Sequence, residues 1–175
     1  MRIRPAAPGD AHAIGRVHVE TWRAAYRGLV SDAYLAGLSP EQRAGRWGEF
    51  LADPSGARFV IVADDDIDGL IGFAAAGPER SGDPKHQGEL YALYVVPLHQ
   101  RQGVGRGLLR AVAGRLVAAG MRSMLLWVLE ANPRARAFYE ALGGVVVRAQ
   151  PIEIGGAILT EVAYAWPELA AIVAD

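Results

Sequence analysis

The chain has 175 residues, a net charge of −1 at pH 7 and no cysteine. Because domains contain about 100–200 residues, we expect one domain spanning residues 1–175. The near-neutral charge argues against a globally basic nucleic-acid-binding protein, and the lack of cysteine excludes disulfides, thiolate metal sites and a cysteine nucleophile.

No targeting segment is visible in the sequence. The first ten residues lack the apolar stretch of a secretory signal, and the strongest apolar run, Met124–Leu129, is far shorter than the ~18 residues of a membrane span. We therefore expect a cytoplasmic protein with no membrane partner. Glycine is unusually abundant, with 21 residues against an average usage of about 7%.

The N-terminal half predicts helices followed by a hairpin. Asp10 is the expected N-cap of the first long helix, and Ser31 or Asp32 that of the second helical stretch. The turn between the two hairpin strands is rich in Asp and Gly. The expected elements are a strand at Arg2–Pro5, helices at Ala11–Arg27, from Ser31 or Asp32 to the break at Gly37–Pro40, and at Glu41–Leu51, and strands at Arg58–Ala63 and Leu70–Ala76.

The C-terminal half predicts alternating strands and helices. Asn132 and Pro133 form a strong helix start, with Asn as N-cap and Pro at the first helical position. Further elements are strands at Glu89–Val96, Ser123–Leu129, Val145–Ala149 and Ala157–Trp166, and a helix at Val104–Ala119. This order predicts an α/β (α+β) fold whose mixed, mostly antiparallel sheet contains a central strand–helix–strand unit.

The most informative segment is the turn before the helix at Val104–Ala119. Three glycines, Gly103, Gly105 and Gly107, would let backbone amides approach a ligand at the helix N-terminus, where the dipole attracts anions. The helix contains no acidic residue and carries Arg106 and Arg110 early, the wrong sign for its own dipole. A bound anion would remove this conflict; the alternative is that arginine is simply abundant, since 17 of 18 basic residues are Arg.

Two familiar phosphate-binding motifs are absent from this segment. A Walker loop requires Gly-Lys followed by Ser or Thr, and the chain has no such sequence. A dinucleotide fingerprint requires a third glycine where Leu108 stands. The anion must therefore belong to another class of ligand.

The segment resembles the GNAT superfamily of N-acetyltransferases. Gln100-x-x-Gly103-x-Gly105 matches the family's motif and follows a strand ending in Leu-Tyr-Val. A second match lies downstream at the family's spacing, in Asn132, Ala135, Phe138-Tyr139 and Gly143. The two matches together are far more specific than either alone, and the order of elements agrees over nearly the whole chain.

The resemblance implies acetyl-CoA as cosubstrate and no metal. Its pantetheine arm would pair with the backbone near Leu93 and Val95, between two strands that splay apart, and Asn132 would hold or order the same region. The residues implied for cofactor binding are Leu93, Val95, Gln100, Arg101, Gln102, Gly103, Val104, Gly105, Arg106, Gly107, Asn132 and Tyr139.

The resemblance also implies the catalytic groups. The Val95 amide would polarise the thioester carbonyl, and Tyr139 would protonate the departing CoA thiolate. Glu89 is a candidate general base for the incoming ammonium. Each residue has a plainer alternative: Asn132 as a helix cap, Tyr139 as a half-buried helix residue and Glu89 as a solvated carboxylate.

The acceptor side is less defined. Trp22 and Tyr26 are four residues apart on the first long helix, which lines the acceptor pocket in the resembling family; the alternative is an apolar contact within the helix. Tyr91 is a third candidate, and it should lie on the opposite face of its strand from Tyr94. Where the family often has an aromatic residue, Gly144 stands here, and we expect looser packing on the acceptor side.

The leading hypothesis is an N-acetyltransferase in which a primary amine attacks acetyl-CoA directly in a ternary complex. A non-catalytic acyl-CoA-binding or sensing module on the same fold and an unrelated α/β protein with a phosphate ligand are the alternatives. The acceptor stays open among polyamines, amino acids, aminoglycoside-like compounds and protein amines. His12 and His18 lie on different helix faces and predict no metal pair, while exposed strand edges suggest a homodimer.

Overall fold

The computed structural model describes residues 1–174, and its elements follow the predicted order with a longer sixth strand and one added C-terminal helix. The strands are β1 (Arg2–Pro5), β2 (Phe59–Asp65), β3 (Gly69–Pro78), β4 (Gly88–Val95), β5 (Met124–Leu129), β6 (Val145–Ile154) and β7 (Ala157–Trp166). The helices are α1 (Ala11–Ala25), α2 (Asp32–Ala36), α3 (Pro40–Leu51), α4 (Val104–Ala118), α5 (Pro133–Ala141) and α6 (Ala170–Ala174), with 3-10 turns at Pro8–Asp10 and Pro97–His99.

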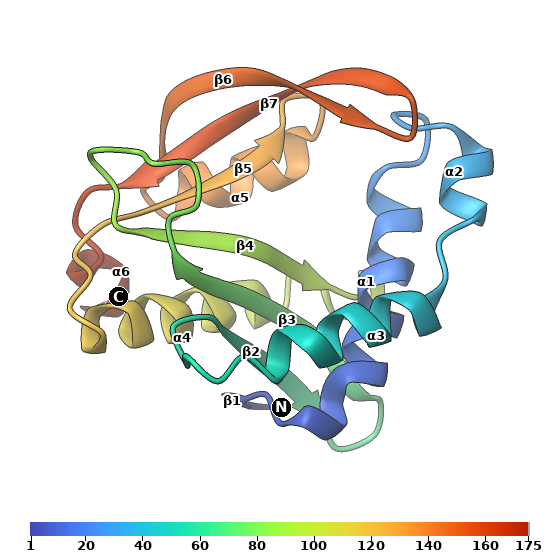
Figure 1. The fold of residues 1–175 in the computed structure, drawn as a ribbon, viewed down its shortest axis with the longest axis horizontal. Coiled ribbons are helices and arrows are strands. Elements are labelled where there is room, and N and C mark those ends of the chain that lie inside the picture. Colours follow the sequence, from blue (N-terminus) through green and yellow to red (C-terminus); the bar gives the residue numbers. More distant parts are fainter. Residues whose placement is uncertain (175) are drawn as a thin grey trace.

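One sheet joins strands from both halves of the chain. Its order is β1-β2-β3-β4-β5-β7-β6 (Figure 1). Every neighbouring pair is antiparallel except β4 and β5, which are parallel and are connected through α4. The predicted fold class, a mixed and mostly antiparallel sheet with a central strand–helix–strand unit, is therefore confirmed.

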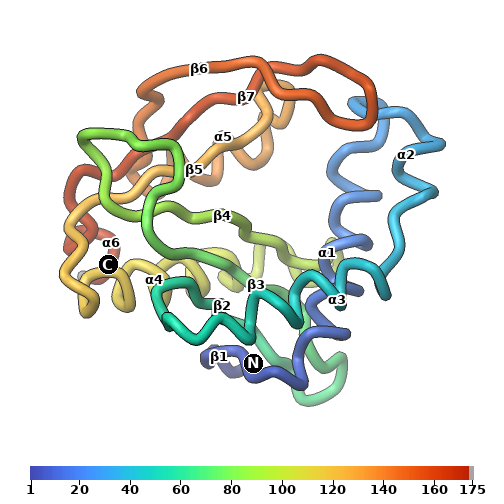
Figure 2. Tube along the Cα trace, viewed as in Figure 1, coloured from blue at the N-terminus to red at the C-terminus, as the bar shows by residue number. Residues whose placement is uncertain are grey.

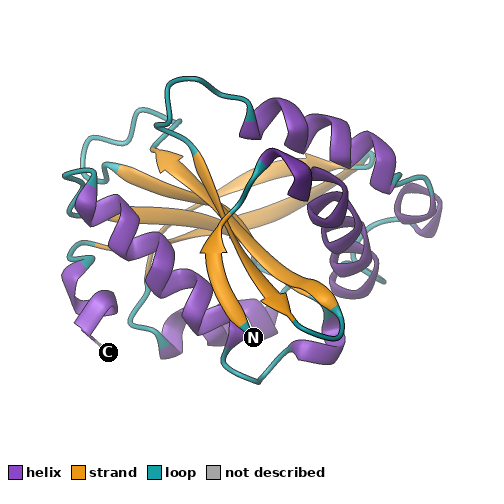
Figure 3. Cartoon of the chain, turned by 90° about the horizontal axis from the view of Figure 1, so that it is seen from below, coloured by secondary structure: helices purple, strands orange, loops and turns teal. Residues whose placement is uncertain are grey.

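Helices cover both faces of the sheet (Figure 3). Packed against one face are α1 and α3, while α4 lies across the other, against β2, β3 and β4. As a result β3 is buried along its length, and its Ala74–Ala76 segment is fully inaccessible. A strand covered on both faces is expected to be a continuous apolar run, as the sequence of β3 is.

The predicted helices start within one residue of their expected positions, α1 at Ala11 included, and two of the predicted caps use their side chains. The Ser31 hydroxyl accepts the Tyr34 amide at α2, and Asn132 Oδ1 accepts the Ala135 amide at 3.1 Å at α5. At α1, however, the carboxylate of Asp10 does not cap the helix. It accepts the Ala7 amide and pairs with a guanidinium, that of Arg4, 2.7 Å away, so it stabilises the preceding 3-10 turn instead.

A close approach of two helices fixes α1 against α3. Gly15 lies where a Cβ would stand 2.5 Å from the Pro40 carbonyl oxygen and 2.7 Å from the Ala44 amide nitrogen. Only glycine lets two helix backbones come this near. The contact matters for the site because α1 carries Trp22 and ends directly before Tyr26.

His18 is buried in an aromatic cage between α1, α3 and the sheet. Its Nδ1 accepts the indole N–H of Trp47 at 3.1 Å, so Nε2 carries the proton, and that nitrogen has no partner among residues 1–174. The rings of Trp22, Phe73 and Tyr94 also lie within 6.2 Å of its centroid. Burial, assisted by nearby arginine charges, lowers the pKa of His18 to about 3.

Replacing Gly15 by Ala should force the two helices apart. We expect the free energy of unfolding to fall by about 1–3 kcal/mol or more, the cost of overpacking. Gly45→Ala is the matched control, because nothing lies within 4 Å of its Cβ position on α3. That variant should gain about 0.5–1 kcal/mol from helix propensity. Equal stabilities of the two variants in urea unfolding would contradict the close approach.

The buried imidazole should make stability depend on pH. The folded pKa of His18 is about 3, below the unfolded value of about 6.5, so the unfolded chain binds the extra proton. Stability contributed by neutral His18 is therefore present above pH 6.5 and is lost on acidification, by about 2 kcal/mol between pH 7 and pH 5. Urea unfolding of His18→Gln should show a smaller pH dependence, while the exposed His12→Gln should match the parent chain.

Candidate functional site

The parallel pairing between β4 and β5 stops partway along the strands. Its last residue pair is Leu90 with Leu126. The next residue, Tyr91, is an extra residue, because its neighbours Leu90 and Ala92 pair with consecutive residues of β3. Such a bulge bends a strand and increases its twist. From this point β4 and β5 diverge, as Figure 1 shows, and the middle of β4 stays only half-buried.

The divergence leaves backbone groups of β4 facing a gap. Val96 donates its amide to the Ile71 carbonyl of β3 at 2.9 Å. Since amides alternate in direction along a strand, those of Leu93 and Val95 face the β5 side, beyond the end of the ladder. These two amides are therefore positioned as the sequence analysis expected for a ligand that adds to β4 as an extra strand.

A second group of unpaired amides lies at the N-terminus of α4. The backbone turns through left-handed conformations at Arg101, with φ 63°, and Gly103, with φ 84°. The amides of residues 101–106 find no hydrogen-bond partner in the part of the chain that the structure describes. The side chains of Arg101 and Arg106 are exposed, and neither forms an ion pair with residues 1–174. Free amides, the helix dipole and two cations together favour a bound anion. We call this turn, residues 101–106, the α4 cradle.

Two predicted cofactor residues use their side chains to hold this loop. Gln100 donates its side-chain amide to the Val95 carbonyl at 2.8 Å, and Gln102 donates to the Leu98 carbonyl at 2.9 Å. These bonds tie the loop to the end of β4. Gln100 therefore holds the turn through its side chain, and the backbone amide of Gln102 has no partner among residues 1–174.

Two of the predicted cofactor glycines, Gly105 and Gly107, let α4 pack closely against its neighbours. A Cβ at Gly105 would stand 3.1 Å from the Phe138 ring, so glycine brings α4 close to α5. At Gly107 it would stand 2.5 Å from Ile3, and the Gly107 amide already donates to the Gly103 carbonyl at 3.0 Å. This engaged amide argues against the predicted role of Gly107 in cofactor binding. Val104 contributes only its amide, because its side chain is in the core.

The two site candidates of the downstream motif are Tyr139, which lies on α5, and Asn132, which caps its start. Tyr139 is buried to 7% exposure against Phe138, Tyr164 and Trp166, and its hydroxyl has no partner among residues 1–174. Burial raises its pKa, so the phenol stays protonated near neutral pH. Asn132 caps α5 through Oδ1, as its plainer alternative required, and its amide NH2 group is left to donate elsewhere.

Trp22 lies against Tyr94 rather than Tyr91. The indole of Trp22 donates to the Tyr94 hydroxyl at 2.9 Å, and Tyr26 packs edge-on to Trp22. Burial raises the pKa of Tyr26 and of Tyr94, so both phenols are neutral. The charge of Glu161 on β7 adds to the shift of Tyr26. Sequence reasoning missed Tyr94 and Glu161, because only the fold brings α1 and β7 to the two sides of the gap.

Tyr91 is not part of this cluster. Its hydroxyl donates to the Pro78 carbonyl at 2.6 Å and its ring lies under the Arg80 guanidinium. The expectation that Tyr91 and Tyr94 occupy opposite faces is wrong, since Tyr91 packs on Phe50 of α3 and Tyr94 on His18 of α1. The bulge at Tyr91 breaks the two-residue alternation on which that expectation rested.

Glu89 lies in the paired part of β4, and its carboxylate is held by an arginine of the β3–β4 loop, Arg80. Its carboxylate accepts the Arg80 backbone amide at 3.1 Å and the Arg80 Nε at 3.0 Å, and its side chain is 4% exposed. Val95 lies six residues farther on, about 20 Å along an extended strand. The structure thus does not bring Glu89 to the gap, and the ion pair opposes its use as a general base.

The glycine at position 144 does not loosen the acceptor side. The Trp166 ring fills the space, so a Cβ at Gly144 would stand 2.7 Å from the ring. Trp166 also donates its indole N–H to the Leu142 carbonyl at 2.7 Å. An aromatic ring from β7 therefore takes the room that a side chain at 144 would need, and the expected loose packing is wrong.

The β6–β7 hairpin closes the top of the gap. Figure 2 shows its turn reaching across to the end of α1 and to α2. At the contact, Gly155 lies so close to Tyr34 of α2 that a Cβ would stand 2.6 Å from the ring, and Ile154 packs on the same cluster. The hairpin thus bridges the two sides of the diverging sheet.

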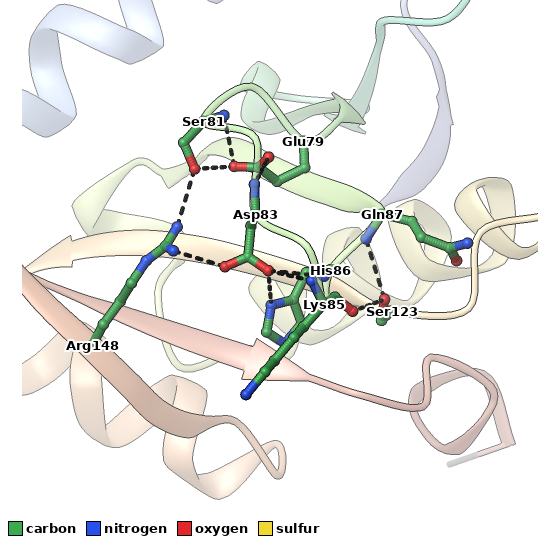
Figure 4. A network of polar contacts seen from close by, with 8 residues as sticks. All are labelled: Glu79, Ser81, Asp83, Lys85, His86, Gln87, Ser123 and Arg148. Carbon is green, nitrogen blue, oxygen red and sulfur yellow. Dashed lines mark hydrogen bonds and ion pairs between the residues drawn. The ribbon is translucent and has the colours of Figure 1, made fainter.

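The acidic residues of the β3–β4 loop are engaged with one another and with β6 (Figure 4). Asp83 pairs with Arg148 at 2.7 Å and accepts the His86 ring at 2.9 Å. Glu79 accepts the hydroxyl and amide of Ser81 and the amide of Asp83. Because these carboxylates already have partners, this loop is a poor candidate for attracting a cationic substrate.

Within residues 1–174, no three His, Asp or Glu side chains lie together in a way that would hold a metal ion. Over the same residues, every helix is too short or too polar to cross a bilayer.

Comparison with known proteins agrees with this geometry. Residues 19–144 match the model of the acetyltransferase (GNAT) family. An uncharacterized N-acetyltransferase of Bacillus subtilis is 37% identical over 172 residues, which cover 98% of this chain and 96% of the relative. A probable N-acetyltransferase of Mycobacterium tuberculosis is 30% identical over 80% of this chain and 77% of the relative.

Solved structures share the fold. The PaiA N-acetyltransferase of Thermoplasma acidophilum, crystallised with coenzyme A, superposes with a TM-score of 0.74 at 21% identity, over 91% of this chain and 96% of that one. YncA of Salmonella typhimurium, crystallised with acetyl-CoA, gives a TM-score of 0.70 at 23% identity, over 97% and 94%. With the family model covering residues 19–144 and a 37%-identical relative aligned over nearly the whole length, the chain belongs to the GNAT family of acetyltransferases.

Proposed function

We propose that the protein transfers an acetyl group from acetyl-CoA to a primary amine, which attacks the thioester directly in a ternary complex. The observation that carries this proposal is that two sets of backbone amides without partners among residues 1–174 lie on adjacent elements, β4 and the start of α4. The free amides at the start of α4 suit the pyrophosphate of CoA, and the amides of Leu93 and Val95 suit the pantetheine arm.

The acetyl thioester is supplied by acetyl-CoA, and the chain supplies orientation and a proton. The Val95 amide, aimed into the gap, stabilises negative charge that develops on the thioester oxygen during attack. The Tyr139 phenol, held neutral by burial, donates a proton to the departing thiolate. No cysteine exists to form an acetyl-enzyme, which agrees with direct attack by the amine.

Three further expectations stay part of the proposal. Seven strands from both halves of the chain in one sheet support a single domain over residues 1–175. The cytoplasmic location rests on the sequence alone. A homodimer is supported by the edge position of β6 and by its exposed residues Val145, Val146 and Val147, and sedimentation velocity would test it.

Acetyl-CoA binding should raise the thermal stability of the chain. At a hundredfold excess over the dissociation constant, the gain is about 2.7 kcal/mol. Gly103→Ala should reduce this gain, because it strains the left-handed residue at the cradle. Gly120→Ala is the matched control: both glycines have φ 84° and open space around a Cβ, and Gly120 lies at the opposite end of α4.

Two results would contradict this assignment. A melting curve of the parent chain that does not move with acetyl-CoA would overturn the cofactor site. An equal loss of the ligand-induced shift in Gly120→Ala would show that the cradle is not the cause. A shift without release of the CoA thiol in the presence of any amine would favour the acyl-CoA-sensing alternative.

The phenol of Tyr139 should be needed for turnover more than for binding. In Tyr139→Phe we expect kcat to fall about a hundredfold or more, the usual contribution of a general acid, with little change in acetyl-CoA affinity. Tyr164→Phe is the control, because its hydroxyl bonds Glu140 and Arg136 at the edge of the same ring cluster. Thiol release measured for both variants decides the point: equal kcat in the parent and Tyr139→Phe would remove the acid role.

A further inference from the structure

A cavity of about 320 Å³ lies between α2 and α3, beside the acceptor side of the gap. Tyr34 contributes one wall, and Gln42, Arg43 and Arg46 line the α3 side; none of the lining residues is acidic. The arginines are three residues apart on one helix, so they share a face. The cavity is therefore a concave and positively charged surface.

The charge of this cavity is not neutralised within the molecule. Other arginines of the chain are paired, for example Arg4 with Asp10, Arg58 with Asp53 and Arg148 with Asp83. By contrast, the guanidinium groups of Arg43 and Arg46 have neither a carboxylate nor a carbonyl partner among residues 1–174; Arg43 only lies over the Trp22 ring, at 5.7 Å.

Polar groups beside the two arginines are also unused. The hydroxyl of Tyr34 and the side-chain amide of Gln42 form no hydrogen bond with the described part of the chain. The positive potential reaches the buried ring of His18, whose pKa both arginines lower after the larger effect of burial. The cavity thus offers several donors to an oxyanion and no carboxylate to an amine.

A series of contacts through Trp22 links the cavity to the residues beside Val95. One face of that indole carries the Arg43 guanidinium, and its N–H donates to the Tyr94 hydroxyl at 2.9 Å. Tyr94 immediately precedes Val95, whose amide faces the gap. Arg43 is therefore separated by a single aromatic ring, that of Trp22, from the residue next to Val95.

We propose that this cavity binds an anionic group of the acceptor. The substrate class is then a small primary amine that also carries a carboxylate or a similar oxyanion, as an amino acid does. Polyamines and aminoglycoside-like compounds are disfavoured, because their cationic groups would be repelled at the arginines and would find the acids of the β3–β4 loop already engaged. The inference rests on the proposed amine acetylation.

Matched amines test the substrate class. With acetyl-CoA saturating, we expect kcat/KM for an amino acid to exceed that for its carboxamide at least tenfold, since a lost charge-assisted hydrogen bond typically costs ten- to a hundredfold. An aminoalkylphosphonate should also be accepted. A preference for the carboxamide, a polyamine or an aminoglycoside would overturn the proposal.

Variants assign the preference to the cavity. In the double variant Arg43→Gln/Arg46→Gln, the ratio of kcat/KM between the amino acid and its carboxamide should fall at least tenfold. Arg122→Gln, which removes an exposed arginine whose guanidinium has no partner among residues 1–174, should keep the parental ratio. An unchanged ratio in the double variant would place the anion elsewhere and contradict the proposal.

A binding measurement separates this inference from the proposed function. Inorganic phosphate should bind the parent chain in titration calorimetry with CoA present to fill the α4 cradle, and binding should be lost in the double variant. Phosphate binding of this kind without acetylation of any amine would retain the cavity as an anion site and reject the acetyl transfer. Acetylation without phosphate binding and without a preference for anionic amines would retain the acetyl transfer and reject the cavity as an anion site.

Discussion

The bulge at Tyr91 is the constraint on which the rest of the site depends. One extra residue in β4 ends its pairing with β5 at Leu90 and sends the two strands apart. A sheet ordinarily satisfies its backbone amides with its own strands, and here the amides of Leu93 and Val95 are left for a ligand. The same bulge turns Tyr91 onto the face that carries Tyr94, so it decides which tyrosine meets Trp22.

Diverging strands require support from elsewhere, and the chain supplies it at both ends of the gap. At the paired end, the β3–β4 loop is tied to β6 through Asp83 and Arg148. At the open end, Gly155 and Ile154 of the β6–β7 hairpin contact Tyr34 and its neighbours on α2. Between these ties the gap can stay open without loss of the surrounding packing.

The paired and unpaired charges of the molecule lie in different regions. The acids of the β3–β4 loop and Glu89 are each held by a partner. Among the arginines without a carboxylate partner in residues 1–174, Arg101 and Arg106 lie at the start of α4, and Arg43 and Arg46 line the α2–α3 cavity. A near-neutral net charge therefore conceals two separate surfaces that carry unpaired arginines, one proposed for the cofactor and the other for the acceptor.

The helix starts, the order of the elements along the chain and the glycine-rich turn before α4 were predictable, because each follows from local chemistry. Ser31 and Asn132 cap helices through their own side chains, and Gly103 allows a left-handed turn wherever it is placed. The capping role of Asp10 was not predictable, because the Arg4 guanidinium competes for its carboxylate. Nor was the ring of Trp166 over Gly144, which comes from a strand 22 residues later.

By itself, then, the sequence determined the fold class, the family and the amide-lined turn before α4. Only the tertiary structure decided that Glu89 pairs with Arg80, that Gly107 packs on Ile3, and that Tyr94 and Arg43 both contact Trp22. The reason is physical. Motifs record the backbone needs of neighbouring residues, whereas ion pairs and ring contacts depend on which distant segments a single bulge brings together.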